Sequence, residues 1–206
     1  MVMVMADQTL PNPGTAWVHY GQIYLADGDG DMADFETLRT SGVGVVGVEP
    51  GAAILLTGLH TGHVGFAVVV AAEDPGADLD GYEDVVEVSF ESRDGTATLV
   101  EWAGGGAHEL PPLPGGAGTY RLRYHSRNTD AAQESPPALE EGSEPVDEYL
   151  LQIWPAPPAP GEVVKATSRH LAYCLSPRRD FSHRRRMTVW PAGPLLQRKV
   201  SARTAA

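Results

Sequence analysis

A single cysteine, Cys174, and the absence of any long apolar run set the first limits on this protein. One cysteine cannot form an internal disulfide, and it excludes a zinc site built from four cysteines. No segment reaches the ~18 apolar residues that a membrane-spanning helix needs. The first five residues alternate Met and Val, without the basic region or apolar core of a secretory signal, and Met3 or Met5 could equally be the true start. We therefore expect a cytoplasmic protein.

Residues that interrupt regular structure are plentiful, with 23 glycines and 17 prolines in 206 residues. This composition predicts an architecture rich in turns and loops. The hydrophobic fraction of 42% is enough to form a core. The length suits one domain with appendages, because domains commonly contain roughly 100–200 residues.

Basic residues are scarce in most of the chain and concentrated at its end. Residues 165–206 contain ten lysines and arginines and one acid, a formal charge of +9, whereas residues 1–164 contain five arginines and 26 acids, a charge of −21. An acidic body repels nucleic acid and attracts basic protein surfaces, although acidity can also serve only to keep a domain soluble. The basic end could touch an anionic surface, but we favour an unstructured tail that folds back on the acidic body.

Alternating and β-branched segments dominate the middle of the sequence. Strands are predicted over 17–25, 43–48, 52–57, 63–72, 84–91, 96–102, 120–125 and 149–154. The segments 52–57 and 63–72 are predicted to pair as a hairpin. Asp94 and Gly95 predict a second hairpin between 84–91 and 96–102, because both residues tolerate positive φ. Residues 32–39 are the best candidate for a short helix.

About eight short strands with regular turns predict an all-β fold, either an antiparallel β-sandwich or an open barrel. Prolines after Trp154 end the last predicted strand, because proline cannot donate to a sheet ladder. We divide the chain into a flexible N-terminal segment, 1–15, an acidic β-sandwich domain, 16–165, and a basic, largely disordered tail, 166–206.

Residues 27–31, with the sequence Asp-Gly-Asp-Gly-Asp, resemble the start of a calcium-binding loop. An EF-hand loop requires Gly at its sixth position and Glu at its twelfth, and these positions hold Met32 and Leu38. The bottom of the calcium cage is therefore missing. A solvated turn is the favoured interpretation.

Histidines provide a second candidate metal site. His60 and His63 have a spacing that could share a metal, but no third ligand lies near them in the sequence. His19, His108 and His125 could join them only if the fold brings these residues together. Turn and surface histidines are the favoured interpretation, and we expect neither a metal nor another cofactor.

Signatures of catalysis are missing from the sequence. It contains no Gly-x-Ser-x-Gly elbow, and no Cys–His constellation can be assembled around Cys174. Gly42-x-Gly44-x-x-Gly47 matches a dinucleotide fingerprint in letters only, because it lies in a strand-like run that no helix follows. We therefore expect that the protein is not an enzyme.

The remaining candidate chemistry lies on two predicted acidic loops, 73–84 and 128–148, and the aromatic residues near them. Charge accelerates the encounter with a basic partner, and an aromatic ring supplies desolvated contact area. The candidate partner-binding residues, all predicted to lie at the surface, are Asp78, Asp80, Tyr82, Glu83, Asp84, Glu140, Glu141, Glu144 and Tyr149.

The order of several segments resembles a known family. These segments are 17–25 (WVHYGQIYL), 51–72, 82–88 (YEDVVEV), 118–124 (GTYRLRY) and 148–155 (EYLLQIWP). Over residues 16–156 the chain resembles uncharacterised actinobacterial proteins and, more distantly, the competence protein J family, small β-rich inhibitors of the DNA-entry nuclease of competent bacteria. The resemblance implies an intracellular inhibitor that masks a nuclease, and it transfers no inhibitory residue. The loop 128–145 and the segment after Pro160 extend beyond such a compact inhibitor.

Three functions stay open at this point. The first is a binding module that inhibits, or confers immunity to, a nuclease or another basic toxin, with no direct contact between the acidic body and nucleic acid or a membrane. The second is a small metal- or carbohydrate-binding sandwich that uses Asp27, Asp29 and Asp31 or the histidines. The third is a scaffolding domain whose basic tail makes the interactions.

Overall fold

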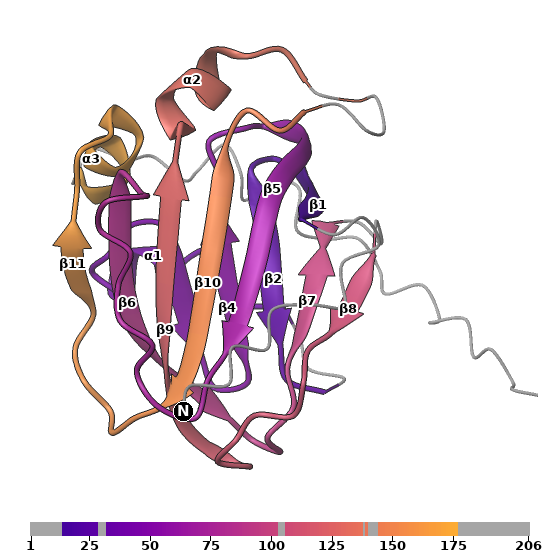
Figure 1. Ribbon diagram of the computed structural model, residues 1–206, viewed down its shortest axis with the longest axis vertical. Coiled ribbons are helices and arrows are strands. Elements are labelled where there is room, and N and C mark those ends of the chain that lie inside the picture. The colour runs from indigo at the N-terminus through magenta and orange to yellow at the C-terminus, as the bar shows by residue number, and fades with distance from the viewer. Residues whose placement is uncertain (1–13, 29–31, 103–105, 138, 140–143, 177–206) are drawn as a thin grey trace, which may run out of the picture.

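The computed structural model describes residues 14–28, 32–102, 106–137, 139 and 144–176. Within them, eleven strands form one sheet (Figure 1). The strands are β1 (Thr15–His19), β2 (Gln22–Ala26), β3 (Val46–Glu49), β4 (Ala52–Leu56), β5 (Thr61–Val70), β6 (Asp84–Ser92), β7 (Thr98–Glu101), β8 (Ala107–Glu109), β9 (Gly118–Arg127), β10 (Glu148–Pro155) and β11 (Glu162–Lys165). The short helices are α1 (Thr37–Thr40), α2 (Thr129–Glu134) and α3 (Arg169–Leu175). The predicted all-β fold is confirmed.

The sheet is curled into a half-barrel with two layers. One layer has the strand order β11-β6-β9-β10-β5-β1, and the other has the order β3-β4-β2-β7-β8. The layers join at the turn between β1 and β2, where only His19 and Gln22 are in register. All strand pairs are antiparallel except β5 and β10, which run parallel. The curled sheet corresponds to the open-barrel form of the prediction, with a mixed rather than purely antiparallel sheet.

The core lies between the two layers and is formed by the inward-facing residues of each strand. On β9 the predicted alternation is confirmed, since Tyr120, Leu122 and Tyr124 are buried in the core while Arg121 and Arg123 are on the opposite face. Along each strand of such a sheet every second residue faces the core, and this is the alternation of apolar residues that the sequence contains.

The predicted single strand 17–25 is wrong, because the chain reverses direction in the middle of it. Tyr20 and Gly21 have φ values of +56° and +61°, as the central residues of a tight hairpin turn of type I′ require. The Gly21 N–H donates to the His60 carbonyl at 2.9 Å, and the Gly21 carbonyl accepts from the Thr57 N–H at 3.1 Å. Residues on both sides of the turn are apolar or aromatic, so the sequence pattern hid the reversal.

Both predicted hairpins are also wrong. The β1–β2 hairpin is inserted between β4 and β5, so that β4 pairs with β2 while β5 pairs with β1. Strands β6 and β7 lie in different layers, since β6 pairs with β9 and β11 and β7 pairs with β2 and β8. Asp94 and Gly95 do form a turn, with the Gly95 N–H donating to the Ser92 hydroxyl at 2.9 Å. A local turn signal predicts where the chain reverses, but it does not predict which strand the segment after the turn pairs with.

Several elements near the end of the described chain were not predicted. Strand β11 adds an edge to β6, and α3 lies in the segment that the sequence assigned to the basic tail. Helix α2 lies in the segment predicted as a loop, and Figure 1 shows it at the same end of the sheet as α3. The Arg169 side chain on α3 pairs with Asp130 and Glu134 of α2 at 3.0 and 2.9 Å. Residues 177–206, and with them most of the predicted tail, lie outside the described residues.

The helices are all short. Helix α1 forms only at the end of the predicted 32–39 helix. No helix in the described part of the chain is long and apolar enough to cross a membrane.

Candidate partner-binding surface

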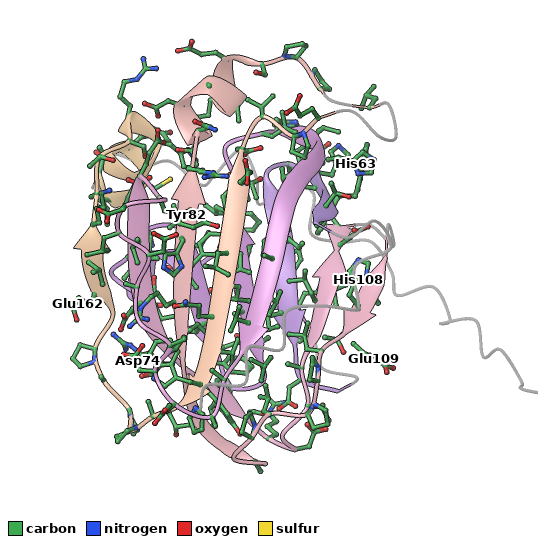
Figure 2. All side chains as sticks on the ribbon, in the orientation of Figure 1. His63, Asp74, Tyr82, His108, Glu109 and Glu162 are labelled. Atoms are coloured by element: carbon green, nitrogen blue, oxygen red, sulfur yellow. The ribbon has the colours of Figure 1, made fainter. Side chains whose placement is uncertain are left out.

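Four of the predicted partner-binding residues lie together on the connection between β5 and β6. Asp78 and Asp80 are exposed on it, and Tyr82 and Glu83 are half-buried. This connection, residues 71–83, passes over the outer face of β9 and β10, and we call it the cover segment. Figure 2 labels Asp74 and Tyr82 along it. Its position means that its residues both face solvent and contact the sheet beneath.

The cover segment is fixed to the sheet by polar contacts. Both carboxylate oxygens of Asp74 accept from the Arg123 guanidinium, at 2.8 and 3.0 Å. The Gln152 side-chain amide donates to the Gly76 carbonyl at 3.0 Å. Hydrogen bonding to Arg123 lowers the pKa of Asp74. Part of the acidity predicted for this loop therefore serves to hold it in place.

Two buried arginines share a carboxylate on the outer face of the sheet: Arg123 lies under the cover segment, and Arg121 donates to the carbonyls of Ala159 and Pro160. Glu87 of β6 accepts from Arg121 at 2.9 Å and from Arg123 at 2.6 Å, and the Arg123 guanidinium lies 4.6 Å from the centre of the Trp154 ring. Buried charges are tolerated only when they are paired and hydrogen-bonded. Asp74 is thus the carboxylate that completes the set of partners around Arg123.

His125 is fully buried beneath the same segment, and both of its ring nitrogens make contacts. Nδ1 lies 3.2 Å from the Leu150 carbonyl, and Nε2 lies 3.2 Å from the Asp78 N–H. A carbonyl can only accept and an N–H can only donate, so the ring is neutral, with its proton on Nδ1. Burial lowers the pKa of His125, and Arg123 also lowers it.

Asp84 was predicted to lie at the surface, and this is wrong, because its side chain is 2% exposed. Its carboxylate accepts from the N–H groups of Thr167 and Ser168 at 2.8 and 3.0 Å and from the Ser168 hydroxyl at 2.5 Å. The Ser168 hydroxyl in turn accepts from the Leu171 N–H and caps α3. Asp84 therefore positions the helix instead of facing solvent.

The prediction that Tyr149 is exposed is wrong as well, because the residue is 1% exposed. Its ring stacks on Tyr124, with 5.4 Å between ring centres, and its hydroxyl donates to Asp147 at 2.5 Å while accepting from the Gly58 N–H at 2.7 Å. Burial raises the pKa of the Tyr149 hydroxyl well above its ordinary value, and burial also raises the pKa of Asp147. Tyr149 is a core residue with a satisfied hydroxyl.

Tyr82 and Glu83 also face the protein to a large extent. The Tyr82 ring lies 5.1 Å from the His125 ring and 5.5 Å from the Arg127 guanidinium, centre to centre. The Glu83 carboxylate accepts from the Asn128 N–H at 2.9 Å. Of the predicted acids on the cover segment, Asp78 and Asp80 are consequently the ones that face solvent.

The second predicted acidic loop is described only in part. Glu144 is exposed shortly before β10, and Glu140 and Glu141 lie outside the described residues. The role of these three residues in partner binding stays a prediction.

The candidate metal ligands are brought together only in part: the His19 and His60 rings lie 6.2 Å apart, centre to centre, whereas His108 and His125 lie elsewhere. Asp27 is buried and accepts from the Arg93 N–H and the Ser92 hydroxyl, so it holds the turn after β6, while residues 29–31 lie outside the described part. His108 pairs with Glu101 at 3.1 Å. Among the described residues, no group of three or more His, Cys, Asp or Glu side chains is placed to hold a metal ion.

A cleft of about 290 Å³ opens between α2, α3 and the β4–β5 connection. His170, Gln133 and His60 contribute polar atoms to its lining. The expectation that no Cys–His pair surrounds Cys174 is wrong, because the buried Cys174 sulfur lies 3.8 Å from Nε2 of His170, which also lines the cleft.

The fold is similar to that of known proteins, although the sequence is not. No protein-family model matches the sequence, and no curated protein sequence matches it. Among solved structures, ComJ from Bacillus subtilis, described as an inhibitor of the DNA-degrading activity of NucA, matches with a TM-score of 0.50 and 13% identity, over 75% of this chain and 99% of ComJ. This chain has a ComJ-like fold.

A second match is the protein of crocagin biosynthetic gene J, with a TM-score of 0.45 and 13% identity, over 70% of this chain and 97% of that one. At 13% identity the match to ComJ establishes the fold alone. The resemblance to actinobacterial proteins is not tested by these comparisons.

One aromatic surface of this chain was not predicted from the sequence. At the junction of the two layers, rings from β1, the β1–β2 turn, the β4–β5 connection, β5 and the residue after β7 lie against one another. We call this set the aromatic corner; it consists of Trp17, His19, Tyr20, His60, His63 and Trp102. The sequence signal that could have revealed it is the Tyr20-Gly21 pair, because glycine there favours a tight turn and an aromatic residue is unusual at its tip.

Proposed function

We propose that this chain is a non-catalytic inhibitor that binds a nuclease or a related protein with a basic surface. The observation that supports the proposal most is the ComJ-like fold, because it extends over 75% of this chain and 99% of a nuclease inhibitor. The order of segments in the sequence supports the same proposal, since it resembles the competence protein J family over residues 16–156.

The distribution of charge supports a basic partner. Residues 1–164 contain no lysine and five arginines, and each arginine contacts a carboxylate or carbonyl of the chain itself. The displayed charge of this part is therefore negative. A negative surface attracts a protein that is built to receive phosphate, and it repels nucleic acid.

The direct test is a DNA-degradation assay with two nucleases. The first is NucA, with ComJ as the positive control, and the second is any nuclease from the host lysate that an affinity column of this chain retains but a column of a charge-matched acidic protein does not. Loss of cleavage of either nuclease at near-equimolar inhibitor supports the proposal. If NucA stays active and no retained nuclease is inhibited, the proposal is contradicted.

The exposed acids allow a finer test of electrostatic steering. We expect the double substitution Asp78→Asn and Asp80→Asn to slow association with the inhibited nuclease several-fold at low salt and to have little effect at high salt, because rim charges act mainly on the association rate. The double substitution Glu109→Gln and Glu162→Gln, at exposed positions of β8 and β11, removes the same charge and is the matched control. Equal association rates for all three proteins would remove the cover segment from the binding surface.

A further inference from the structure

The aromatic corner has the properties of a binding surface and contributes little to the core, against which its Trp102 packs. On β1, Ala16 and Val18 are buried in the core, whereas Trp17 and His19 are half-buried on the opposite face. Figure 2 shows His63 on β5, on the opposite side of β10 from the cover segment. The corner is thus separate from the polar contacts that hold residues 71–83.

The rings of the corner form two contact groups, Trp17 with His63 and Tyr20 with His19, His60 and Trp102. The two groups adjoin because Trp17 and His19 lie on the same face of β1. Trp17 contacts His63 edge to face at 5.0 Å, and Tyr20 contacts His60 at 5.1 Å and Trp102 at 6.4 Å, all between ring centres. Tryptophan and tyrosine are the residue types that contribute most energy at protein interfaces. Six rings within one small area, none of them fully buried, form a surface of that composition.

The centre of the corner is held in an unfavourable backbone conformation. Tyr20 has a φ of +56°, in the left-handed backbone region where residues other than Gly, Asn and Asp are uncommon. Type I′ turns usually place Asn or Gly at this position. Asparagine would relieve the backbone but lose the ring contacts with His19, His60 and Trp102, so the tyrosine places an aromatic ring at the tip of the turn at the cost of a less favourable backbone. Backbone outliers that the surrounding structure holds in place concentrate at functional sites.

Hydrogen bonds from neighbouring segments hold the backbone of the corner in place. The backbone of Gly21 is hydrogen-bonded to Thr57 and His60, and the Trp17 N–H donates to the buried carboxylate of Glu101 at 2.9 Å. Glu101 is fixed in turn by His108. A preorganised aromatic surface loses little conformational entropy when it binds.

The charge of the chain indicates what binds to these rings. All five arginines of residues 1–164 contact carboxylates or carbonyls, and the two that lie over a ring lie over Trp154 and Tyr82, outside the corner. A guanidinium stacks on the face of Trp or Tyr and gains from an acidic environment. We propose that the aromatic corner binds arginine side chains on the surface of the protein partner. This proposal rests on the proposed function, because it names the surface and the chemistry by which the partner is recognised.

The test uses Tyr20→Asn, since asparagine suits the backbone of the turn while removing the ring. Tyr173→Ala is the matched control, because Tyr173 is 57% exposed on α3 and lies outside the corner. Binding of the inhibited nuclease is measured by calorimetry, and circular dichroism checks that each variant is folded. We expect Tyr20→Asn to weaken binding about tenfold or more, Tyr20→Phe to restore it, and Tyr173→Ala to leave it unchanged.

A second probe does not depend on the nuclease. Oligo-arginine and oligo-lysine peptides of equal length are titrated while tryptophan fluorescence is recorded. We expect oligo-arginine to bind several-fold more tightly than oligo-lysine, and Tyr20→Asn to abolish the difference, because only the planar guanidinium stacks well on a ring. If the nuclease binds both Tyr20→Asn and the wild type equally, the corner is not the surface, although the inhibitor function stands. If the peptides reproduce the arginine preference but no nuclease is bound, the corner stands and the proposed function fails. Equal binding of both peptides by every variant overturns the inference.

Discussion

The outer face of the larger layer has two halves: one is covered by another segment of the chain, and the other is partly exposed to solvent. Over β6, β9 and β10 the outward residues include Glu87, Arg121 and Arg123, and the Asp74 carboxylate of the cover segment pairs with Arg123. Over β1 and the start of β5 the outward residues include Trp17, His19 and His63, which are half-buried. The comparison shows that charge in this sequence is a poor guide to the partner surface, because much of it is used within the fold. The rings at the aromatic corner contact one another and stay partly exposed.

The largest expected effect is on the covered half. Arg123→Ala leaves the largely buried Glu87 without one of its two guanidinium partners and removes the ion pair with the exposed Asp74. Removing one partner from a buried pair typically costs about 3–5 kcal/mol, and we expect the lower end because Arg121 still pairs with Glu87. We expect urea denaturation to show a loss of unfolding free energy of this size. Arg39→Ala removes an exposed ion pair and should change stability by less than ~0.5 kcal/mol. Similar stabilities for the two variants would mean that the cover segment is not held by its ion pairs.

A second prediction separates structural acids from displayed acids. Asp84→Ala removes three hydrogen bonds to Thr167 and Ser168 and leaves buried donors unsatisfied, which costs about 1–3 kcal/mol. Hydrogen exchange should become faster in α3 first, because Ser168 caps it. Asp80→Ala, on the exposed part of the cover segment, is expected to leave both stability and exchange unchanged. Equal behaviour of the two variants would contradict the assignment of Asp84 to the fold.

These two carboxylates show what the sequence could and could not predict. Strand positions followed from period-two alternation, but the partner of each strand did not, because alternation defines faces and not neighbours. Asp84 looked like its acidic neighbours, since the serine it binds is 84 residues away. Tyr149 was different: it alternates in phase with Leu151 and Ile153, so the sequence already contained the signal for burial. The Tyr20 turn was obscured by aromatic residues on both sides.

A third prediction concerns pH and again probes the covered half. The pKa of His125 is lowered from 6.5 in the folded state, so the unfolded chain binds the extra proton first as the pH falls. The stability linked to His125 is complete above about pH 6.5 and is lost as the pH falls toward the lowered pKa. Arg123 opposes protonation, while Asp78 and Glu87 favour it, and the Tyr82 ring packs against the imidazole.

Measured between about pH 7 and pH 5, wild-type stability should therefore decrease with a slope that His125→Gln reduces. Asp74 has a lowered pKa too, but its contribution is lost only at more acidic pH, below the ordinary value of 3.8. If His125→Gln leaves the slope unchanged, protonation of His125 does not affect stability through its hydrogen bond with the Asp78 N–H.

The smallest expected effect is on the stability of the aromatic corner. In Tyr20→Asn, relief of the positive φ offsets the loss of ring contacts, each worth about 0.5–1.5 kcal/mol. We expect the midpoint of thermal unfolding to change by only a few degrees. A collapse of stability would assign Tyr20 to the fold and weaken the comparison between the two halves.

The most direct test of the account is hydrogen exchange of this chain, free and in complex with the nuclease that it inhibits. Both halves of the outer face are read in the same experiment. The account predicts new protection at residues 17–21 and 60–63, with little change in the buried contacts of the cover segment around residue 74. Protection confined to residues 71–83, with none at the β1–β2 turn, would contradict it.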